Sequence, residues 1–136
     1  MNVSVIGCGY VGLVTGACFS EFGLTVTCTD RDVDRIGLLQ SGEAPIYEPV
    51  LADLLSRSIS AERLTFTSNR EQAIRDGLVI FIAVGTPSAI DGSTDLSFVE
   101  AVAREIGRNL DEYKVIVTKS TVPVGTSIKV REWIQD

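Results

Sequence analysis

The chain contains no histidine, and its three cysteines, Cys8, Cys18 and Cys28, form no C-x-x-C pair. A zinc site is therefore not expected, and we predict no metal site. The commonest general base is missing as well. Any acid–base chemistry falls to carboxylates, lysine, tyrosine, or threonine with water, or to residues outside this chain. We expect all three cysteines to be small buried thiols.

Basic residues are scarce, since 12 Lys and Arg stand against 18 Asp and Glu, for a formal net charge of −6. Binding to nucleic acid is not expected, because phosphate contacts need clustered Lys and Arg. No apolar stretch reaches the roughly 18 residues of a membrane span. The apolar residues 1–14 lack a basic leader, so they do not read as a signal peptide. We expect a cytoplasmic protein with no membrane partner.

Apolar residues, by contrast, are plentiful, at 45% of a chain of 136 residues, which is enough for the core of one domain. Apolar strands alternate with amphipathic helices. Strands are predicted at residues 2–6, 25–29, 64–67, 78–84 and 114–118, and helices at residues 10–22, 32–40, 50–58, 70–75, 96–109 and 125–134. This alternation predicts an α/β fold with a doubly wound parallel sheet. The nearly continuous apolar run 78–84 predicts a strand covered on both faces.

The first predicted strand runs directly into a G-x-G-x-x-G turn, Gly7-Cys8-Gly9-Tyr10-Val11-Gly12, that opens a helix. In Rossmann-type folds the first glycine permits the tight turn and the second lets the backbone approach a pyrophosphate. The third lets the helix pack closely on the strand. Free N–H groups at the helix start would face that anion. The apolar strand before the turn and the helix after it favour dinucleotide binding over an ordinary strand-turn-helix.

Asp30 follows the second predicted strand, 18 residues beyond Gly12, close to the spacing of about 20 expected for the acid that binds the adenosine ribose. A carboxylate accepts both ribose hydroxyls and repels a 2′-phosphate, so the predicted coenzyme is NAD. Two alternatives stay open. Asp30 could only cap the next helix, and the adjacent Arg31 is either a solvated surface charge or a partner for a 2′-phosphate.

Two more loops follow predicted strands, Val84-Gly85-Thr86-Pro87 and the segment Lys-Ser-Thr-Val-Pro-Val-Gly-Thr at residues 119–126. Open α/β sheets bind ligands beyond the carboxyl ends of their strands. Gly85 would allow a close approach there, and Thr86 and Thr121 offer hydroxyls that donate or accept. A threonine after a strand is also often only a helix cap, and that alternative stays open for both.

These motifs together resemble the NAD-binding domain of the UDP-glucose/GDP-mannose dehydrogenase family. The resemblance rests on residues 7–13, on Pro-Ile-Tyr-Glu-Pro at 45–49, on residues 84–87 with Asp-Gly at 91–92 and Asp-Leu at 95–96, and on residues 119–126. It covers essentially the whole chain. Val50 stands where the family usually has glycine, so this loop is expected to bend differently.

The resemblance implies roles for individual residues. Arg35 stands where the family usually has a lysine beside the adenosine ribose, and Thr86 would lie along the cofactor. Thr121 would lie near the nicotinamide and help to place a water, which makes it the one catalytic residue expected in this chain. The implied cofactor-binding residues are Gly7, Gly9, Tyr10, Val11, Gly12, Asp30, Arg35, Gly85, Thr86, Pro87 and Thr121.

Family members oxidise a sugar's primary alcohol to a carboxylate in two hydride transfers to NAD, using a cysteine in a later domain. No segment of this chain matches the one that carries that cysteine. The resemblance implies that residues 1–136 are the NAD-binding part of a longer enzyme, ending before an expected sixth strand and inactive alone. The nucleotide-sugar substrate would bind through domains outside this chain, and the full-length enzyme would be a homo-oligomer.

UDP-glucose is the expected substrate, with GDP-mannose or a UDP-N-acetylaminosugar as alternatives. An alternative from another class of protein is an NAD-sensing regulatory domain of a potassium channel or transporter. Such a domain shares the glycine turn and the acid after the second strand. It would not need the motifs at residues 85–87 and 120–123.

Overall fold

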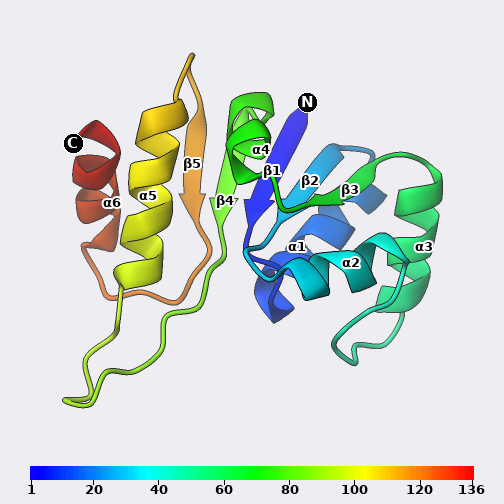
Figure 1. The fold of residues 1–136 in the computed structure, drawn as a ribbon, viewed down its shortest axis with the longest axis horizontal. Coiled ribbons are helices and arrows are strands. Elements are labelled where there is room, and N and C mark those ends of the chain that lie inside the picture. The colour runs from blue at the N-terminus through cyan, green and yellow to red at the C-terminus, as the bar shows by residue number, and fades with distance from the viewer.

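The computed structural model describes residues 1–136 and has a five-stranded sheet at its centre (Figure 1). The strands are β1 (Asn2–Ile6), β2 (Thr25–Thr29), β3 (Leu64–Thr67), β4 (Val79–Ile82) and β5 (Val115–Thr118). Their order is β3-β2-β1-β4-β5, and every pairing is parallel. The chain therefore adds β2 and β3 on one side of β1, and then returns to add β4 and β5 on the other side. This strand order confirms the predicted doubly wound parallel sheet.

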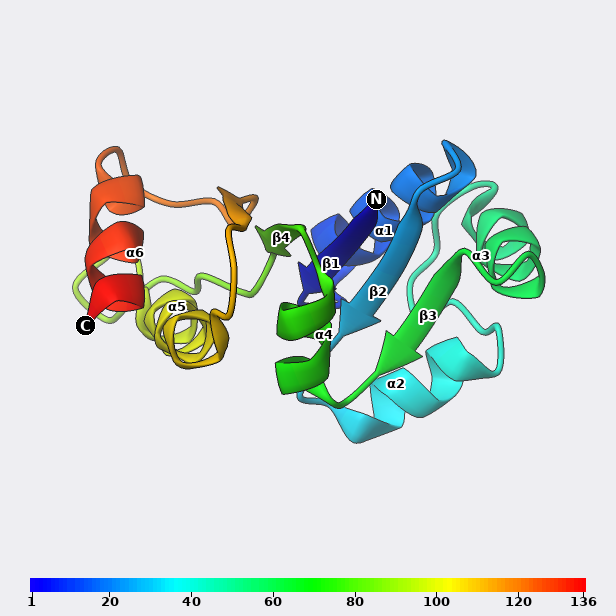
Figure 2. The ribbon, with the colours of Figure 1, turned by 90° about the horizontal axis from the view of Figure 1, so that it is seen from above.

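Six helices surround the sheet (Figure 2). They are α1 (Tyr10–Glu21), α2 (Val33–Gln40), α3 (Leu51–Ser60), α4 (Arg70–Asp76), α5 (Ser97–Asn109) and α6 (Thr126–Gln135). Helix α1 lies on one face of the sheet and packs against α3, whereas α4 and α5 lie on the other face. Helix α6 packs against α5, and α2 packs against β3. No helix of this structure is both long and apolar enough to cross a membrane.

The two faces of β4 are buried to different extents. Ile80 and Ile82 are fully buried in an apolar cluster with α5 and α6. Val79 and Phe81 point to the opposite face, where they are only half-buried, although the Phe81 ring lies 5.1 Å from that of Phe19 on α1. The strand is therefore covered on both faces as predicted, completely on the α5 side and partly on the α1 side.

Close packing of α1 depends on two glycines. A Cβ at Gly12 would collide with the carbonyl of Gly7, so this glycine lets the helix approach the turn that precedes it. The helix approaches β2 one turn later, at Gly16, where a Cβ would meet the sulfur of Cys28 at 2.5 Å. The predicted close packing at Gly12 is present, since its Cβ would also lie 3.3 Å from the Cβ of Ala83 at the end of β4, and Gly16 adds a second close approach to β2.

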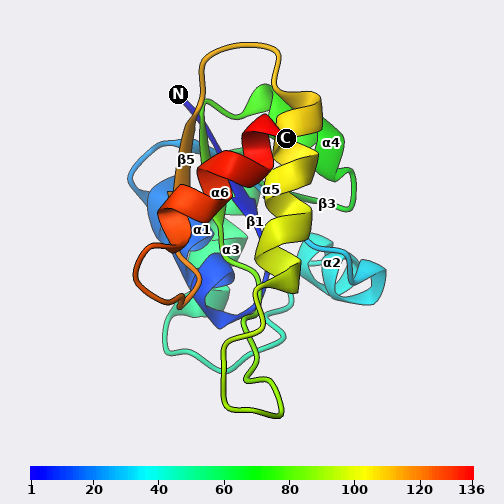
Figure 3. The ribbon, with the colours of Figure 1, turned by 90° about the vertical axis from the view of Figure 1, so that its left-hand side faces the viewer.

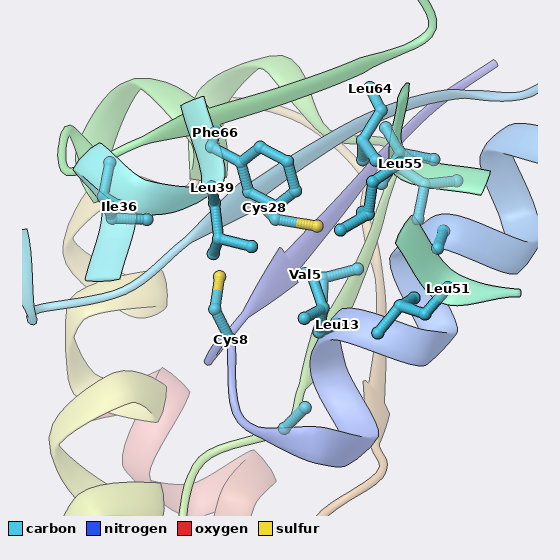
Figure 4. Close-up of a cluster of buried hydrophobic side chains, with 14 residues drawn as sticks. Val5, Cys8, Leu13, Cys28, Ile36, Leu39, Leu51, Leu55, Leu64 and Phe66 are labelled. Atoms are coloured by element: carbon cyan, nitrogen blue, oxygen red, sulfur yellow. The ribbon is translucent and has the colours of Figure 1, made fainter. Parts of the chain in front are cut away.

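The three cysteines are free thiols in two different environments. Cys8 and Cys28 are buried in the apolar cluster between the sheet and α1, near Leu39 and Phe66 (Figure 4). The pKa of the Cys28 thiol is raised well above its usual value by the hydrogen bond with Cys8 and by burial. Cys18 is exposed on α1, so the prediction of a buried thiol is wrong there.

The loop before α3 contains an unusual backbone conformation. Val50 precedes the helix with φ 69°, in the left-handed region that glycine adopts readily and that β-branched residues rarely occupy. Its side chain is 63% exposed, so packing does not compensate the strain. The loop thus takes a bend that suits the glycine usual at this position, whereas the sequence led us to expect a different bend.

Candidate functional site

A cleft of about 350 Å³ opens at the carboxyl edge of the sheet. It lies where the strand order reverses between β1 and β4, which is where open parallel sheets bind ligands. Its walls are the ends of β1, β2 and β4 on one side and α5 on the other. The lining residues are Ile6, Gly7, Gly9, Asp30, Arg31, Arg35, Arg70, Ala83, Val84, Gly85, Phe98, Ala101 and Val102.

The glycine turn forms the floor of this cleft. Gly7 has φ 108°, and a Cβ there would collide with the carbonyl of Ala83, so the fold itself requires glycine. Gly9 is different, because its φ of −72° suits any residue and no protein atom lies within 4 Å of where its Cβ would be. Gly85 also faces open space. Neither glycine is demanded by the protein's own packing, and each leaves room for a ligand against the backbone.

Helix α1 begins at this floor without a capping side chain. Gly9 is its N-cap, no side chain accepts from its first amides, and its first turn holds no acidic residue. The first backbone bond of the helix runs from the amide of Leu13 to the carbonyl of Gly9. The preceding amides and the positive end of the helix dipole are available to an anion.

Asp30 is held in place by backbone donors. Its Oδ2 accepts from the amide of Cys8 at 2.8 Å, and its Oδ1 accepts from the amide of Asp32 at 2.9 Å. Arg35 Nη1 lies 3.8 Å from Oδ2, and the Asp30 side chain is 13% exposed. Asp32, not Asp30, caps α2 by accepting from the amide of Arg35. The alternative that Asp30 only caps the next helix is therefore wrong.

The loops after β4 and β5 are tied to each other. Thr86 Oγ1 donates to the carbonyl of Thr121 at 2.7 Å, and Ser120 Oγ donates to the carbonyl of Val84 at 2.7 Å. Neither threonine caps a helix, since the N-cap of α5 is Leu96 and that of α6 is Gly125. The helix-cap alternative is wrong for both.

Beyond Thr86 the chain continues into a hairpin-like loop that extends past the edge of the sheet (Figure 3). The amide of Asp95 donates to the carbonyl of Pro87 at 2.8 Å, and Ser88 and Thr94 form an antiparallel bridge. Pro87 therefore lies at the base of this loop and outside the lining of the cleft. The loop is ordered by its own hydrogen bonds.

Five of the predicted cofactor residues line the cleft together, namely Gly7, Gly9, Asp30, Arg35 and Gly85. Gly12 lies beneath the turn, and Tyr10, Val11, Thr86, Pro87 and Thr121 are outside the lining. Tyr10 is engaged elsewhere, because its hydroxyl donates to Glu48 Oε2 at 2.7 Å. That hydrogen bond and the charge of Glu48 raise the pKa of the Tyr10 phenol.

The structure adds residues that the sequence did not point to. Arg70 lines the cleft and pairs with Glu105, although its Nε has no partner. The position of Arg70 at the start of the helix that follows the third strand was a signal that could have found it. Phe98 also lines the cleft, under the guanidinium of Arg31. No local pattern marks Phe98, since an aromatic residue near a helix start is usually part of the core.

Comparison with known proteins gives a match over the whole chain. Residues 1–136 match the model of the UDP-glucose/GDP-mannose dehydrogenase family, NAD binding domain. The chain is 52% identical over 135 residues to a UDP-glucose 6-dehydrogenase of Pseudomonas aeruginosa, covering 99% of this chain and 30% of that protein. It is 52% identical over 134 residues to the UDP-glucose 6-dehydrogenase TuaD of Bacillus subtilis, covering 98% and 29%. The chain thus spans under a third of the length of these relatives.

Solved structures agree. A UDP-glucose dehydrogenase from Pyrobaculum islandicum superposes with a TM-score of 0.95 at 40% identity, over 98% of this chain and 32% of that one. A GDP-mannose dehydrogenase of Pseudomonas aeruginosa, solved as a ternary complex, gives 0.96 at 40%, over 100% and 32%. These matches leave the alternative of a channel-regulating domain without support. The open backbone at Gly9 and the fixed carboxylate of Asp30 fit a dinucleotide, and the chain belongs to the UDP-glucose/GDP-mannose dehydrogenase family, of which it forms the NAD-binding domain.

Proposed function

We propose that NAD binds in the cleft with its diphosphate against the glycine turn and its adenosine ribose on Asp30. The single observation that carries this placement is the open space over Gly9, which nothing in the protein requires to be glycine. The uncapped start of α1 would bind the diphosphate through free amides. When bound, NAD supplies a hydride acceptor.

Asp30 would select the coenzyme. Each of its oxygens already accepts one backbone N–H, which fixes the carboxylate and leaves lone pairs for two ribose hydroxyls. Its charge would repel a 2′-phosphate. Arg35, which also lines the cleft and pairs with the carboxylate at 3.8 Å, would lie beside the ribose. This arrangement supports NAD rather than NADP as the ligand.

The nicotinamide end would be formed by the joined loops after β4 and β5. Gly85 and Thr86 would lie along the coenzyme, with Pro87 at the base of the following loop. Thr121 would help to place a water near the nicotinamide. Support comes from the hydrogen bond between Thr86 and the carbonyl of Thr121, which joins the two loops. Tyr10 and Val11 would contribute backbone amides at the start of α1.

We propose that the longer protein oxidises UDP-glucose to UDP-glucuronate in two successive hydride transfers, consuming a water and two NAD⁺. Both UDP-glucose 6-dehydrogenases described above share 52% of their aligned residues with this chain. GDP-mannose remains the alternative substrate, because the GDP-mannose dehydrogenase of Pseudomonas aeruginosa is 40% identical over the full chain. A UDP-N-acetylaminosugar is a further alternative, since a UDP-ManNAc dehydrogenase of Pyrococcus horikoshii is 31% identical.

The experiment measures NADH formation from the three nucleotide sugars by the longer protein and by residues 1–136 alone. We expect the longer protein to prefer UDP-glucose and the short chain to bind NAD⁺ without turnover, because Cys8, Cys18 and Cys28 all lie outside any segment like the one that carries the family's catalytic cysteine. Preference for another sugar would replace the proposed substrate. Turnover by residues 1–136 would show that no later domain is needed.

We further propose a cytoplasmic location, no nucleic-acid partner, and a homo-oligomeric full-length enzyme. The three free thiols suit a reducing compartment. The net charge of −6 disfavours contact with a phosphate backbone. Cell fractionation and sedimentation of the longer protein test location and assembly; a membrane-bound fraction or a monomer would contradict them.

A further inference from the structure

Two side chains of the cleft lining, Arg31 and Phe98, contact each other. The guanidinium carbon of Arg31, in the loop after β2, lies 4.3 Å from the centre of the Phe98 ring on the first turn of α5. Both residues line the cleft, and Arg31 directly follows Asp30. The pair therefore joins the two walls of the cleft next to the carboxylate that would hold the ribose.

The contact between these two side chains is the only polar or aromatic contact that holds Arg31. Arg35 pairs with Asp30 and Arg70 pairs with Glu105, but the exposed Arg31 makes no hydrogen bond and no ion pair. A cation over an aromatic face at an exposed site is a weak interaction. At 4.3 Å no ring fits between the two groups, so a ligand entering here must separate them.

The surroundings of the pair suit a flat, largely apolar group with a polar attachment. Ala101 and Val102 of α5 continue the wall beside Phe98, and the charged Asp30 lies on the other side. A base attached to a ribose on Asp30 would reach the neighbouring Arg31. Guanidinium planes and aromatic rings both stack on nucleobases.

We propose that Arg31 and Phe98 form a clamp that opens to take the adenine ring of the dinucleotide between guanidinium plane and aromatic face. Before binding, the two side chains stack on each other and close the apolar wall from water. The clamp determines specificity for the adenosine half of the coenzyme. This proposal depends on the proposed binding of the adenosine ribose to Asp30.

Calorimetric titration with NAD⁺ and with nicotinamide mononucleotide, which lacks the adenosine half, tests the clamp. Phe98→Leu should weaken NAD⁺ binding about tenfold, because stacking of a base on an aromatic ring is lost. Arg31→Ala should weaken it about threefold, and Phe98→Tyr, which keeps the ring, should bind as the unaltered protein does. Affinity for the mononucleotide should stay unchanged in all three. Phe22→Leu and Arg57→Ala, on exposed positions away from the cleft, are matched controls expected to change neither affinity.

Three results would overturn the clamp. The first is equal loss of affinity for both ligands, and the second is unchanged NAD⁺ binding in Phe98→Leu and Arg31→Ala. The third is an Arg31→Ala variant that loses NADP⁺ but not NAD⁺, which would make Arg31 a phosphate contact. If the unaltered, folded protein binds no NAD⁺ at all, the proposed function fails together with the clamp, so the two failures are distinguishable. Arg31→Ala and Phe98→Tyr decide the question even if Phe98→Leu does not fold.

Discussion

Replacing Gly9 by alanine separates what the coenzyme requires from what the fold requires. The new methyl group would meet no protein atom within 4 Å, and φ −72° with ψ −167° is open to any residue. Because neither a clash nor backbone strain results, we expect the free energy of unfolding to change by less than about 0.5 kcal/mol. Urea unfolding followed by circular dichroism measures it.

The same methyl group would occupy the space where the diphosphate is proposed to lie. Forcing one extra carbon into a filled contact costs about 1–3 kcal/mol. Since each 1.4 kcal/mol is a factor of ten in affinity, Gly9→Ala should raise the Kd for NAD⁺ by about 5- to 140-fold. Isothermal titration calorimetry measures this loss on the same preparation.

Two further glycines serve as controls for Gly9→Ala. Gly37 in α2 also faces open space but lies outside the cleft, so Gly37→Ala should keep the affinity and gain about 1 kcal/mol from helix propensity. Gly12→Ala should destabilise the protein, because its Cβ would collide with the carbonyl of Gly7. Unchanged NAD⁺ affinity in a folded Gly9→Ala variant would refute the placement of the diphosphate.

Three other substitutions test separate parts of the structure. Asp30→Ala should weaken NAD⁺ binding about 10- to 100-fold, since hydrogen bonds to a charged group are worth about 1.5–3 kcal/mol. It should also reduce the preference for NAD⁺ over NADP⁺. Titration with both coenzymes measures the two affinities, and if neither changes, Asp30 is not part of the site. Val50→Gly should raise the free energy of unfolding by about 1 kcal/mol, because the left-handed conformation at φ 69° no longer carries a β-branched side chain; a loss of stability in urea would contradict this. Lys114→Met should lower the free energy of unfolding by about 2–3 kcal/mol, because two backbone carbonyls would lose their donor. The buried ammonium donates to the carbonyl of Arg75 at 2.7 Å and to that of Gly77 at 2.9 Å. A variant as stable as the parent in thermal unfolding would show that water replaces the ammonium.

Local patterns were sufficient for the elements of the fold. Strand β1 and β2 begin and end where the sequence predicted, and the turn of residues 7–12 opens α1 at Tyr10 as expected. Strand alternation and turn chemistry depend on neighbouring residues, so a linear reading captures them. Other boundaries moved by one or two residues, as in β4, which runs from Val79 to Ile82 where residues 78–84 were predicted.

The residues of the candidate site also fall into two groups, those that the sequence predicted and those that only the structure revealed. Gly7, Gly9 and Asp30 were predictable, because their spacing along one βαβ unit sets their positions at the carboxyl edge of β1 and β2. The stacking of Arg31 on Phe98 was not predictable, because it joins the loop after β2 to helix α5, and these two segments become neighbours only through the order of the strands in the sheet.

The burial of individual side chains could not be predicted from the sequence either. Cys18 and Cys28 look alike in the sequence, yet one is exposed on α1 and the other lies against Gly16. Order along the chain, turn positions and the acid after the second strand follow from interactions between near neighbours. Which side chains face each other across the cleft follows from crossovers that bring distant segments together, and that information is present only once the sheet has assembled.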